Sequence, residues 1–142
     1  MIFKDKVAVV TGGANGIGKA ITEQFTASGA KVAVIDIRDN PYFVRDIADK
    51  EVLEKFAAKV IKDFGKVDFL INNAPPAMYG IKDCTYEQFE RALAVGVTAP
   101  FYLAKLFYGH FAEGASIVNI SSSRDRQSQP NTESYTAAKG GI

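Results

Sequence analysis

The chain has 142 residues and a formal charge of +1, from 17 basic and 16 acidic residues. Its apolar fraction of 47% and charged fraction of 23% are those of a globular domain and exclude a disordered chain. The balanced charge gives no indication of a nucleic-acid or membrane-surface partner. A single cysteine, Cys84, excludes an intrachain disulfide, and a single histidine, His110, leaves no set of metal ligands. We expect one cytoplasmic domain, residues 1–142, without a secretory signal or a segment of membrane-spanning length.

Short β-branched runs alternate along the chain with longer segments of helical periodicity. Pro100 is expected to kink the longest of the predicted helices. The alternation predicts an α/β fold with a mainly parallel sheet. In chain order, we predict a strand at 7–11, a helix at 17–28 closed by Gly29, a strand at 31–35, a helix at 49–64, a strand at 67–71, a helix from a capping box at Thr85 and Gln88 towards Phe111, a strand at 115–120, and a final helix that begins near Ser134.

The segment between Asp36 and Asp46 is unusually short for this fold class. Only nine residues separate the two acids, whereas a parallel crossover with its helix needs about a dozen or more. We therefore predict a strand near 42–45 without a helix before it.

A glycine-rich turn, TGGANGIG at 11–18, joins the first strand to the first helix. Glycines at 12, 16 and 18 allow a tight turn and let a pyrophosphate approach the backbone and the free N–H groups of the helix. Such a turn by itself is also compatible with a purely structural role.

Asp36 ends the second strand, where a carboxylate can accept hydrogen bonds from a ribose diol. A carboxylate there repels a 2′-phosphate, and the neutral Asn15 in the turn offers that phosphate no cation. Both residues favour NAD over NADP, while Arg38 keeps NADP open.

Five motifs, in order and spacing, resemble the NAD(P)-dependent short-chain dehydrogenase/reductase family. They are TGGANGIG at 11–18, Asp36, INNA at 71–74, IVNISS at 117–122 and YTAAK at 135–139. The resemblance covers essentially the whole chain and implies a doubly wound Rossmann sheet. It also implies a hydride transfer between the nicotinamide and a secondary alcohol or ketone.

Within this resemblance, Tyr135 would be the general acid/base, and Lys139 would favour its phenolate and bind the nicotinamide ribose. Ser122 would hydrogen-bond the reacting oxygen, and Asp46 with Ile47 would contact adenine. Tyr135 and Lys139, four apart, share one face of a helix. The residues expected to contact the cofactor are Gly12, Asn15, Gly16, Ile17, Gly18, Asp36, Ile37, Asp46, Ile47, Asn73, Ala74, Tyr135 and Lys139.

Three departures from the family pattern leave alternatives open. Gly96 stands where members usually carry an asparagine of the proton relay, which indicates either a slower or rerouted relay or a subgroup that does without it. Pro75 follows NNA where glycine is common, so the backbone there must run differently.

The third departure is that the sequence ends at Ile142, within the catalytic helix. We expect the rest of the fold to belong to a longer parent protein, which would form a homodimer or homotetramer. The alternatives are a non-catalytic dinucleotide-binding or interaction protein and an assembly fragment that needs a partner to complete its sheet.

Overall fold

Five parallel strands form the centre of the fold, in the order β3-β2-β1-β4-β5. A computed structural model describes all residues, 1–142. The strand order reverses between β1 and β4, which places a topological switch point beside the carboxyl end of β1. This confirms the predicted doubly wound α/β fold. The strands are β1 Val7–Thr11, β2 Lys31–Asp36, β3 Phe43–Val44, β4 Val67–Asn72 and β5 Phe111–Asn119.

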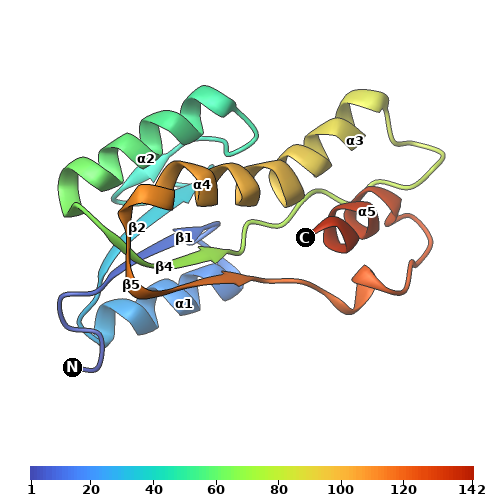
Figure 1. The fold of residues 1–142 in the computed structure, drawn as a ribbon. Helices are drawn as coiled ribbons and strands as arrows, with labels where there is room; N and C mark the ends of the chain where they lie inside the picture. Colours follow the sequence, from blue (N-terminus) through green and yellow to red (C-terminus); the bar gives the residue numbers. More distant parts are fainter.

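Helices cover the two faces of the sheet unequally. Figure 1 shows α2 and α4 over one face and α1 alone on the other, with α5 beyond the carboxyl ends of the strands. Leu53 and Phe56 of α2 meet Leu103 and Phe107 of α4 in the main apolar cluster. The helices are α1 Gly16–Ala27, α2 Lys50–Phe64, α3 Tyr86–Leu93, α4 Ala99–Phe107 and α5 Glu133–Gly141, with 3₁₀ turns at Tyr108–His110 and Ser123–Asp125.

The connection from β2 to β3 contains no helix, as its length predicts. The Asn40 side chain closes the turn: its amide nitrogen donates to the Arg38 carbonyl at 3.0 Å, and its oxygen accepts from the backbone N–H groups of Tyr42 and Phe43. The two-residue strand β3 then pairs in parallel with β2. A side-chain-stabilised turn thus replaces the usual crossover helix.

The long helical segment is distorted just before Pro100. Ala94–Thr98 forms a π-helical turn, and Pro100 lies in the first turn of α4. Proline has no N–H to donate to the carbonyl of Gly96, four residues earlier, so the regular ladder cannot pass through this point. The predicted distortion is therefore confirmed, and it takes the form of a wider turn at 94–98. The predicted capping box at Thr85 and Gln88 is also present.

The same segment bears on the expectation that no stretch approaches membrane-spanning length. Tyr86–His110 runs for 25 residues and contains an 18-residue window with a mean hydropathy of 1.3, so by length and composition alone it could cross a membrane. In the structure its apolar side serves the core: Leu103 and Phe107 are fully buried against the sheet and α2. A core helix that packs on a buried parallel sheet has the same apolar composition as a membrane-spanning helix.

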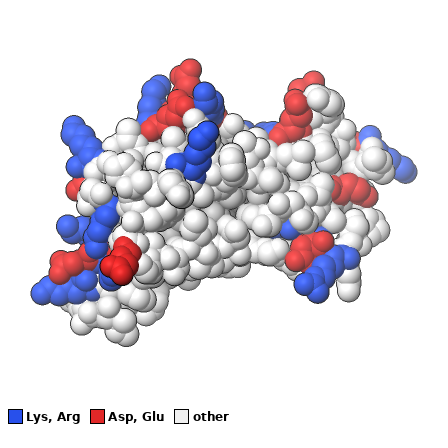
Figure 2. Space-filling view, in the orientation of Figure 1, with Lys and Arg blue, Asp and Glu red and all other residues white.

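Strand β5 lies at the edge of the sheet and is largely exposed. Ile117 and Val118 retain 47% and 42% of their accessible surface. The middle of the molecule, where β5 runs, carries few charged side chains, whereas charges gather at both ends (Figure 2). In other doubly wound folds a central strand of this composition is covered on both faces.

Candidate functional site

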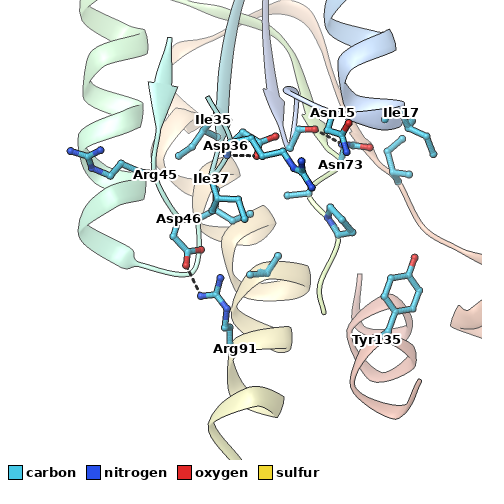
Figure 3. A pocket seen from close by; sticks show the side chains of 18 of the residues that line it. Asn15, Ile17, Ile35, Asp36, Ile37, Arg45, Asp46, Asn73, Arg91 and Tyr135 are labelled. Atoms are coloured by element: carbon cyan, nitrogen blue, oxygen red, sulfur yellow. Dashed lines mark hydrogen bonds and ion pairs between the residues drawn. The ribbon is translucent and has the colours of Figure 1, made fainter. Parts of the chain in front are cut away.

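A cleft of about 440 Å³ lies at the carboxyl ends of the strands, at the switch point of the sheet. Every residue predicted to contact a cofactor, apart from Gly18, lines this cleft. Figure 3 shows Asp36, Asn15 and Asn73 on the side formed by the sheet, and Tyr135 projecting from α5. The tertiary structure thus brings together residues that come from five separate segments of the chain.

The glycine-rich turn is too tightly packed for larger residues. A Cβ at Gly12 would lie 2.8 Å from the Cα of Ala74, and Gly12 has a positive φ of 66°. A Cβ at Gly18 would lie 2.0 Å from the Gly12 carbonyl oxygen. Gly18 therefore allows α1 to pack against the end of β1, which explains why it does not reach the cleft surface.

The N-terminus of α1 differs from those of α2 and α3 because it has no internal cap. The Asn15 side chain makes no capping hydrogen bond, and the first turn contains no acidic residue. In contrast, Asp49 and Thr85 cap α2 and α3 through their side-chain oxygens. The first N–H groups of α1 therefore have no side-chain acceptor and lie beside the cleft, as an anion-binding turn requires.

Asp36 is buried at the end of β2 and is held in a defined orientation. One carboxylate oxygen accepts from the backbone N–H of Ala14, and the other accepts from the backbone N–H of Arg38, both at 2.9 Å. The carboxylate thus links the glycine-rich turn to the strand end. Each oxygen retains further lone pairs that can accept hydroxyl donors from the cleft.

A second network ties β4 to the turn. The Asn73 amide nitrogen donates to the carbonyl oxygens of Thr11 and Gly12 at 3.1 and 3.0 Å. The Thr11 hydroxyl oxygen accepts from the backbone N–H groups of Asn73 and Ala74, both at 3.0 Å. Asn73 was expected to contact the cofactor, yet here its amide nitrogen shapes the turn. Thr11 was not singled out from the sequence.

The far end of the cleft contains an ion pair that sequence reasoning missed. Arg91 of α3 reaches Asp46, with Nη1 and Oδ2 2.5 Å apart (Figure 3). Asp46 also accepts from the backbone N–H of Ala48 at 3.0 Å. Burial raises the pKa of Asp46, but the hydrogen bonds from Arg91 and Ala48 outweigh it, so the pKa lies below its ordinary value. No local pattern around Arg91 indicates this partner 45 residues away.

Tyr135 and Lys139 lie on the cleft side of α5. Lys139 is only 5% exposed, and its ammonium donates to the backbone carbonyl of Ile120 at the end of β5. The ammonium nitrogen lies 5.6 Å from the centroid of the Tyr135 ring. Burial lowers the pKa of Lys139. The predicted pairing of a phenol with an ammonium on one helix face is present.

Ser122 lies next to the cleft but does not line it. Its hydroxyl oxygen caps the 3₁₀ turn Ser123–Asp125 by accepting from the backbone N–H of Arg124 at 3.2 Å. The neighbouring Ser121 lines the cleft instead. The role predicted for Ser122, binding the reacting oxygen, stays a prediction.

Ser134 anchors the helix that carries Tyr135. Its hydroxyl donates to the carbonyl of Ala77 and accepts from the backbone N–H of Tyr79, both at 2.8 Å. The side chain is fully buried. The loop after β4 and the start of α5 are therefore held together by one residue that carries no recognisable motif.

Gly96 packs directly against the helix that carries the tyrosine and lysine. A Cβ at Gly96 would lie 2.7 Å from the Cβ of Ala138 and 3.2 Å from the Cγ of Pro76. Two departures from the expected pattern, the glycine at 96 and the proline pair after Ala74, thus lie side by side. The contact indicates that the absence of a side chain at 96 is matched to its neighbours.

The donor set and the shape of the site fit a dinucleotide. The uncapped turn suits a pyrophosphate, Asp36 suits a ribose diol, and the Ile37 and Ile47 side chains give the Asp46 end of the cleft apolar walls. No cluster of His, Cys, Asp or Glu suited to a metal ion is present. Tyr135 and Lys139 line the same cleft.

The known proteins that this chain resembles include an oxidoreductase and a dehydrogenase. The chain is 33% identical to an uncharacterised oxidoreductase of Thermotoga maritima, over 99% of this chain and 62% of that protein. It is 32% identical to the NAD-dependent glycerol dehydrogenase of Listeria innocua, over 97% of this chain and 61% of that protein.

Two solved structures are similar to this fold. An apo "SCOR enzyme" of Clostridium thermocellum matches with a TM-score of 0.89 and 38% identity, covering 96% of this chain and 61% of that one. A short-chain dehydrogenase of Burkholderia cenocepacia in complex with NADP matches with a TM-score of 0.90 and 28% identity, covering 99% and 65%. The chain thus spans about three fifths of the length of the curated relatives described above. The family model for short-chain dehydrogenases matches residues 6–142, and the chain therefore belongs to the short-chain dehydrogenase family.

Proposed function

We propose that this chain carries the cofactor site and the acid/base pair of an NAD-dependent oxidoreductase acting on a secondary alcohol or ketone. One observation carries the proposal: Tyr135 and Lys139 line the same cleft as the glycine-rich turn and Asp36. The family membership supports nicotinamide-dependent oxidoreduction in general. The alcohol or ketone as substrate class rests on the phenol at the cleft wall, because a phenol suits proton exchange with a hydroxyl or carbonyl oxygen.

The nicotinamide, when bound, supplies the acceptor or donor of a hydride. In the oxidising direction, the phenolate of Tyr135 takes the proton of the substrate hydroxyl as the carbinol C–H bond breaks and the C=O bond forms. Lys139 holds its ammonium 5.6 Å from the centroid of the Tyr135 ring and would bind the nicotinamide ribose. In the reducing direction, Tyr135 returns that proton to the carbonyl oxygen. The uncapped N-terminus of α1 and Asp36 would hold the dinucleotide, and Tyr135 and Lys139 of α5 would act on the substrate.

The choice of NAD over NADP rests on Asp36. Its carboxylate is fixed by two backbone N–H groups and presents negative charge where a 2′-phosphate would lie. Relatives of both kinds occur, an NAD-dependent glycerol dehydrogenase and a dehydrogenase crystallised with NADP. Arg38 and Arg45 also line the cleft, so the expected preference for NAD depends on Asp36 outweighing these cations.

A Tyr135→Phe variant tests the acid/base assignment. Removing the phenolic hydroxyl should lower turnover of alcohols and ketones by about 10²- to 10⁴-fold, a far larger effect than any change in NAD affinity. Tyr108→Phe is a matched control, because Tyr108 is 85% exposed and lies far along the chain from α5. Cofactor oxidation is followed over a panel of ketones, and NAD binding is followed by calorimetry. Equal rates for Tyr135→Phe and the parent protein would remove Tyr135 from the mechanism.

A second candidate function is dinucleotide binding without turnover. The observation that favours it is Gly96, which provides no side chain at the position of the family's relay asparagine. This function predicts NAD binding of normal strength together with no oxidation or reduction of any ketone or alcohol in the panel. Detectable turnover that depends on Tyr135 would exclude it, and the absence of NAD binding would exclude both functions.

Assembly and location complete the proposal. We expect a cytoplasmic location and, where the full family fold is present, a homodimer or homotetramer. The exposed apolar residues Ile117 and Val118 of β5 are consistent with further contacts at this edge of the sheet. Small-molecule substrates are the expected partners, and nucleic acids or membranes are not. Sedimentation velocity of the purified protein measures the oligomeric state directly, and a monomer at micromolar concentration would contradict this expectation.

A further inference from the structure

Arg124 is a charged residue beside Tyr135 that the proposed reaction does not use. It lies in the 3₁₀ turn Ser123–Asp125, between β5 and α5, and is half-buried. Its guanidinium carbon is 5.9 Å from the centroid of the Tyr135 ring. The guanidinium also lies 3.2 Å from the sulfur of Met78 and donates to the Gln129 side-chain oxygen at 2.6 Å. Arg124 is therefore held where the loop after β4, the loop before α5 and the tyrosine meet.

No carboxylate balances the charge of Arg124. It takes part in none of the ion pairs of the molecule, although most pairs involve exposed surface residues. The adjacent Asp125 is engaged elsewhere: it accepts from the Ser121 hydroxyl at 3.3 Å and lies 3.9 Å from Arg126. Neutral acceptors occupy only two of the five guanidinium N–H groups.

Lys139 adds a second unbalanced cation on the same tyrosine. Its ammonium lies 5.6 Å from the Tyr135 ring centroid and hydrogen-bonds only a backbone carbonyl. Two partly buried cations without an acidic partner are unfavourable unless a ligand brings negative charge. In the proposed function the pyrophosphate binds at α1 and Lys139 serves the ribose. Arg38 and Arg45 line the cleft near Asp36 and Asp46, whereas Arg124 lies beside Tyr135, just outside the cleft lining, and is the cation there to which the proposed function assigns no anion.

We propose that Arg124 binds an anionic group of the substrate, a carboxylate or a phosphate, so that the substrates are hydroxy acids, oxo acids or phosphorylated hydroxy compounds. The planar guanidinium fork matches two oxygens of such a group in a bidentate contact. The anion then fixes the distance between its carbinol carbon and Tyr135. For a hydroxy acid, bound NAD⁺ would accept the carbinol hydride, and Tyr135 would take the hydroxyl proton as the C=O bond forms. The carboxylate itself is unchanged.

This inference rests on the proposed function and has one competing explanation. Arg124 could instead serve Tyr135 by stabilising the phenolate, because a cation near an aromatic ring and its oxygen favours the ionised form. That role would affect every substrate equally. A substrate-binding role affects only substrates that carry the anion, so the two explanations give different patterns of kcat and KM.

The test compares matched substrates with the purified, cofactor-loaded protein. The carboxylate arm uses 2-oxobutanoate, 3-oxobutanoate and 4-oxopentanoate, each against its methyl ester. The phosphate arm uses dihydroxyacetone phosphate against dihydroxyacetone. Arg124→Gln removes the fork, Arg124→Lys keeps the charge without the fork, and Arg126→Gln removes an adjacent charge of a residue on the exposed side of the turn.

We expect one anionic series to exceed its neutral partners in kcat/KM, and the series that does so identifies carboxylate or phosphate. Arg124→Gln should then raise KM for the anionic substrate by about 10- to 100-fold, with kcat and the neutral partners nearly unchanged. Arg124→Lys should lie between, and Arg126→Gln should match the parent. Equal use of anionic and neutral substrates would overturn the inference. So would an equal loss of kcat on both classes in Arg124→Gln.

A binding measurement separates this inference from the proposed function. Calorimetry titrates 2-oxobutanoate and inorganic phosphate into the protein saturated with NAD⁺, in which an oxo acid cannot be reduced. Anion binding that is lost in Arg124→Gln and kept in Arg126→Gln supports the site even if no substrate is turned over. Absence of binding to the parent protein overturns the site, whatever the turnover of neutral ketones shows.

Discussion

The contact between Gly96 and Ala138 allows a quantitative test of how α5 is positioned. The perturbation is Gly96→Ala, which places a methyl carbon 2.7 Å from the Cβ of Ala138 and 3.2 Å from the Cγ of Pro76. Carbon atoms without a bond between them prefer about 3.5–4.0 Å. The first contact is therefore about 1 Å too short, and neither Cβ can rotate away, since each is bound directly to its backbone.

The expected destabilisation follows from two opposing effects. Overpacking a filled site costs about 1–3 kcal/mol, while alanine in place of glycine in a helix recovers up to about 1 kcal/mol. We expect Gly96→Ala to lower the free energy of unfolding by about 1–2 kcal/mol. Ala138→Gly removes the closer partner and should recover most of the loss. The double-mutant cycle should therefore show a favourable coupling of about 1–3 kcal/mol.

Urea denaturation of the four proteins in the cycle measures this coupling. Gly109→Ala is the matched control, because a Cβ at Gly109 would meet no atom within 4 Å. NAD affinity is measured in parallel, since a displaced α5 carries Lys139 with it. Gly96→Ala and Ala138→Gly that act additively within about 0.5 kcal/mol would refute the reasoning. The family-typical Gly96→Asn adds a larger side chain at the same place and should be at least as destabilising.

Two further predictions concern buried carboxylates. Asp36→Asn should weaken NAD binding by about tenfold or more and raise the affinity for NADP relative to NAD, because the fixed negative charge is lost. Calorimetry measures both affinities, with Asp39→Asn, an exposed neighbour, as the control. An unchanged ratio of NAD to NADP affinity would contradict the assignment of Asp36. Asp68 is 2% exposed; burial raises its pKa, but hydrogen bonds from the Val7 N–H, Lys6 and Lys66 outweigh this and lower it below 3.8. Its stabilisation is therefore present above pH 3.8 and lost as pH falls through the folded-state pKa. Asp68→Asn should cost about 1–3 kcal/mol at pH 7, because it leaves Lys6 and Lys66 without their carboxylate partner, and the cost should fall as the pH is lowered below 3.8. Urea titrations at pH 7 and pH 3 test this, and a cost independent of pH would contradict it.

The agreement between sequence and structure follows the range of the interactions. Strand and helix positions were predictable because periodicity, capping and turn chemistry act within a few residues. The predicted capping box at Thr85 and the helix-free connection after Asp36 are both confirmed. The glycine-rich turn was predictable because its glycine spacing is a local motif, although the close packing of Gly12 against Ala74 involves a residue distant in the chain. For the segment Tyr86–His110, length and composition do not distinguish a core helix from a membrane-spanning one.

The sequence by itself thus determined the parallel α/β fold, the dinucleotide turn and the pairing of Tyr135 with Lys139 on one helix face. Only the tertiary structure decided which side chains meet across the cleft. Arg91 and Asp46, Gly96 and Ala138, and Arg124 and Tyr135 belong to different elements, and their contacts depend on how α3, α5 and the loops pack. No local pattern records such contacts, because their energy comes from partners distant in the chain that are brought together by folding.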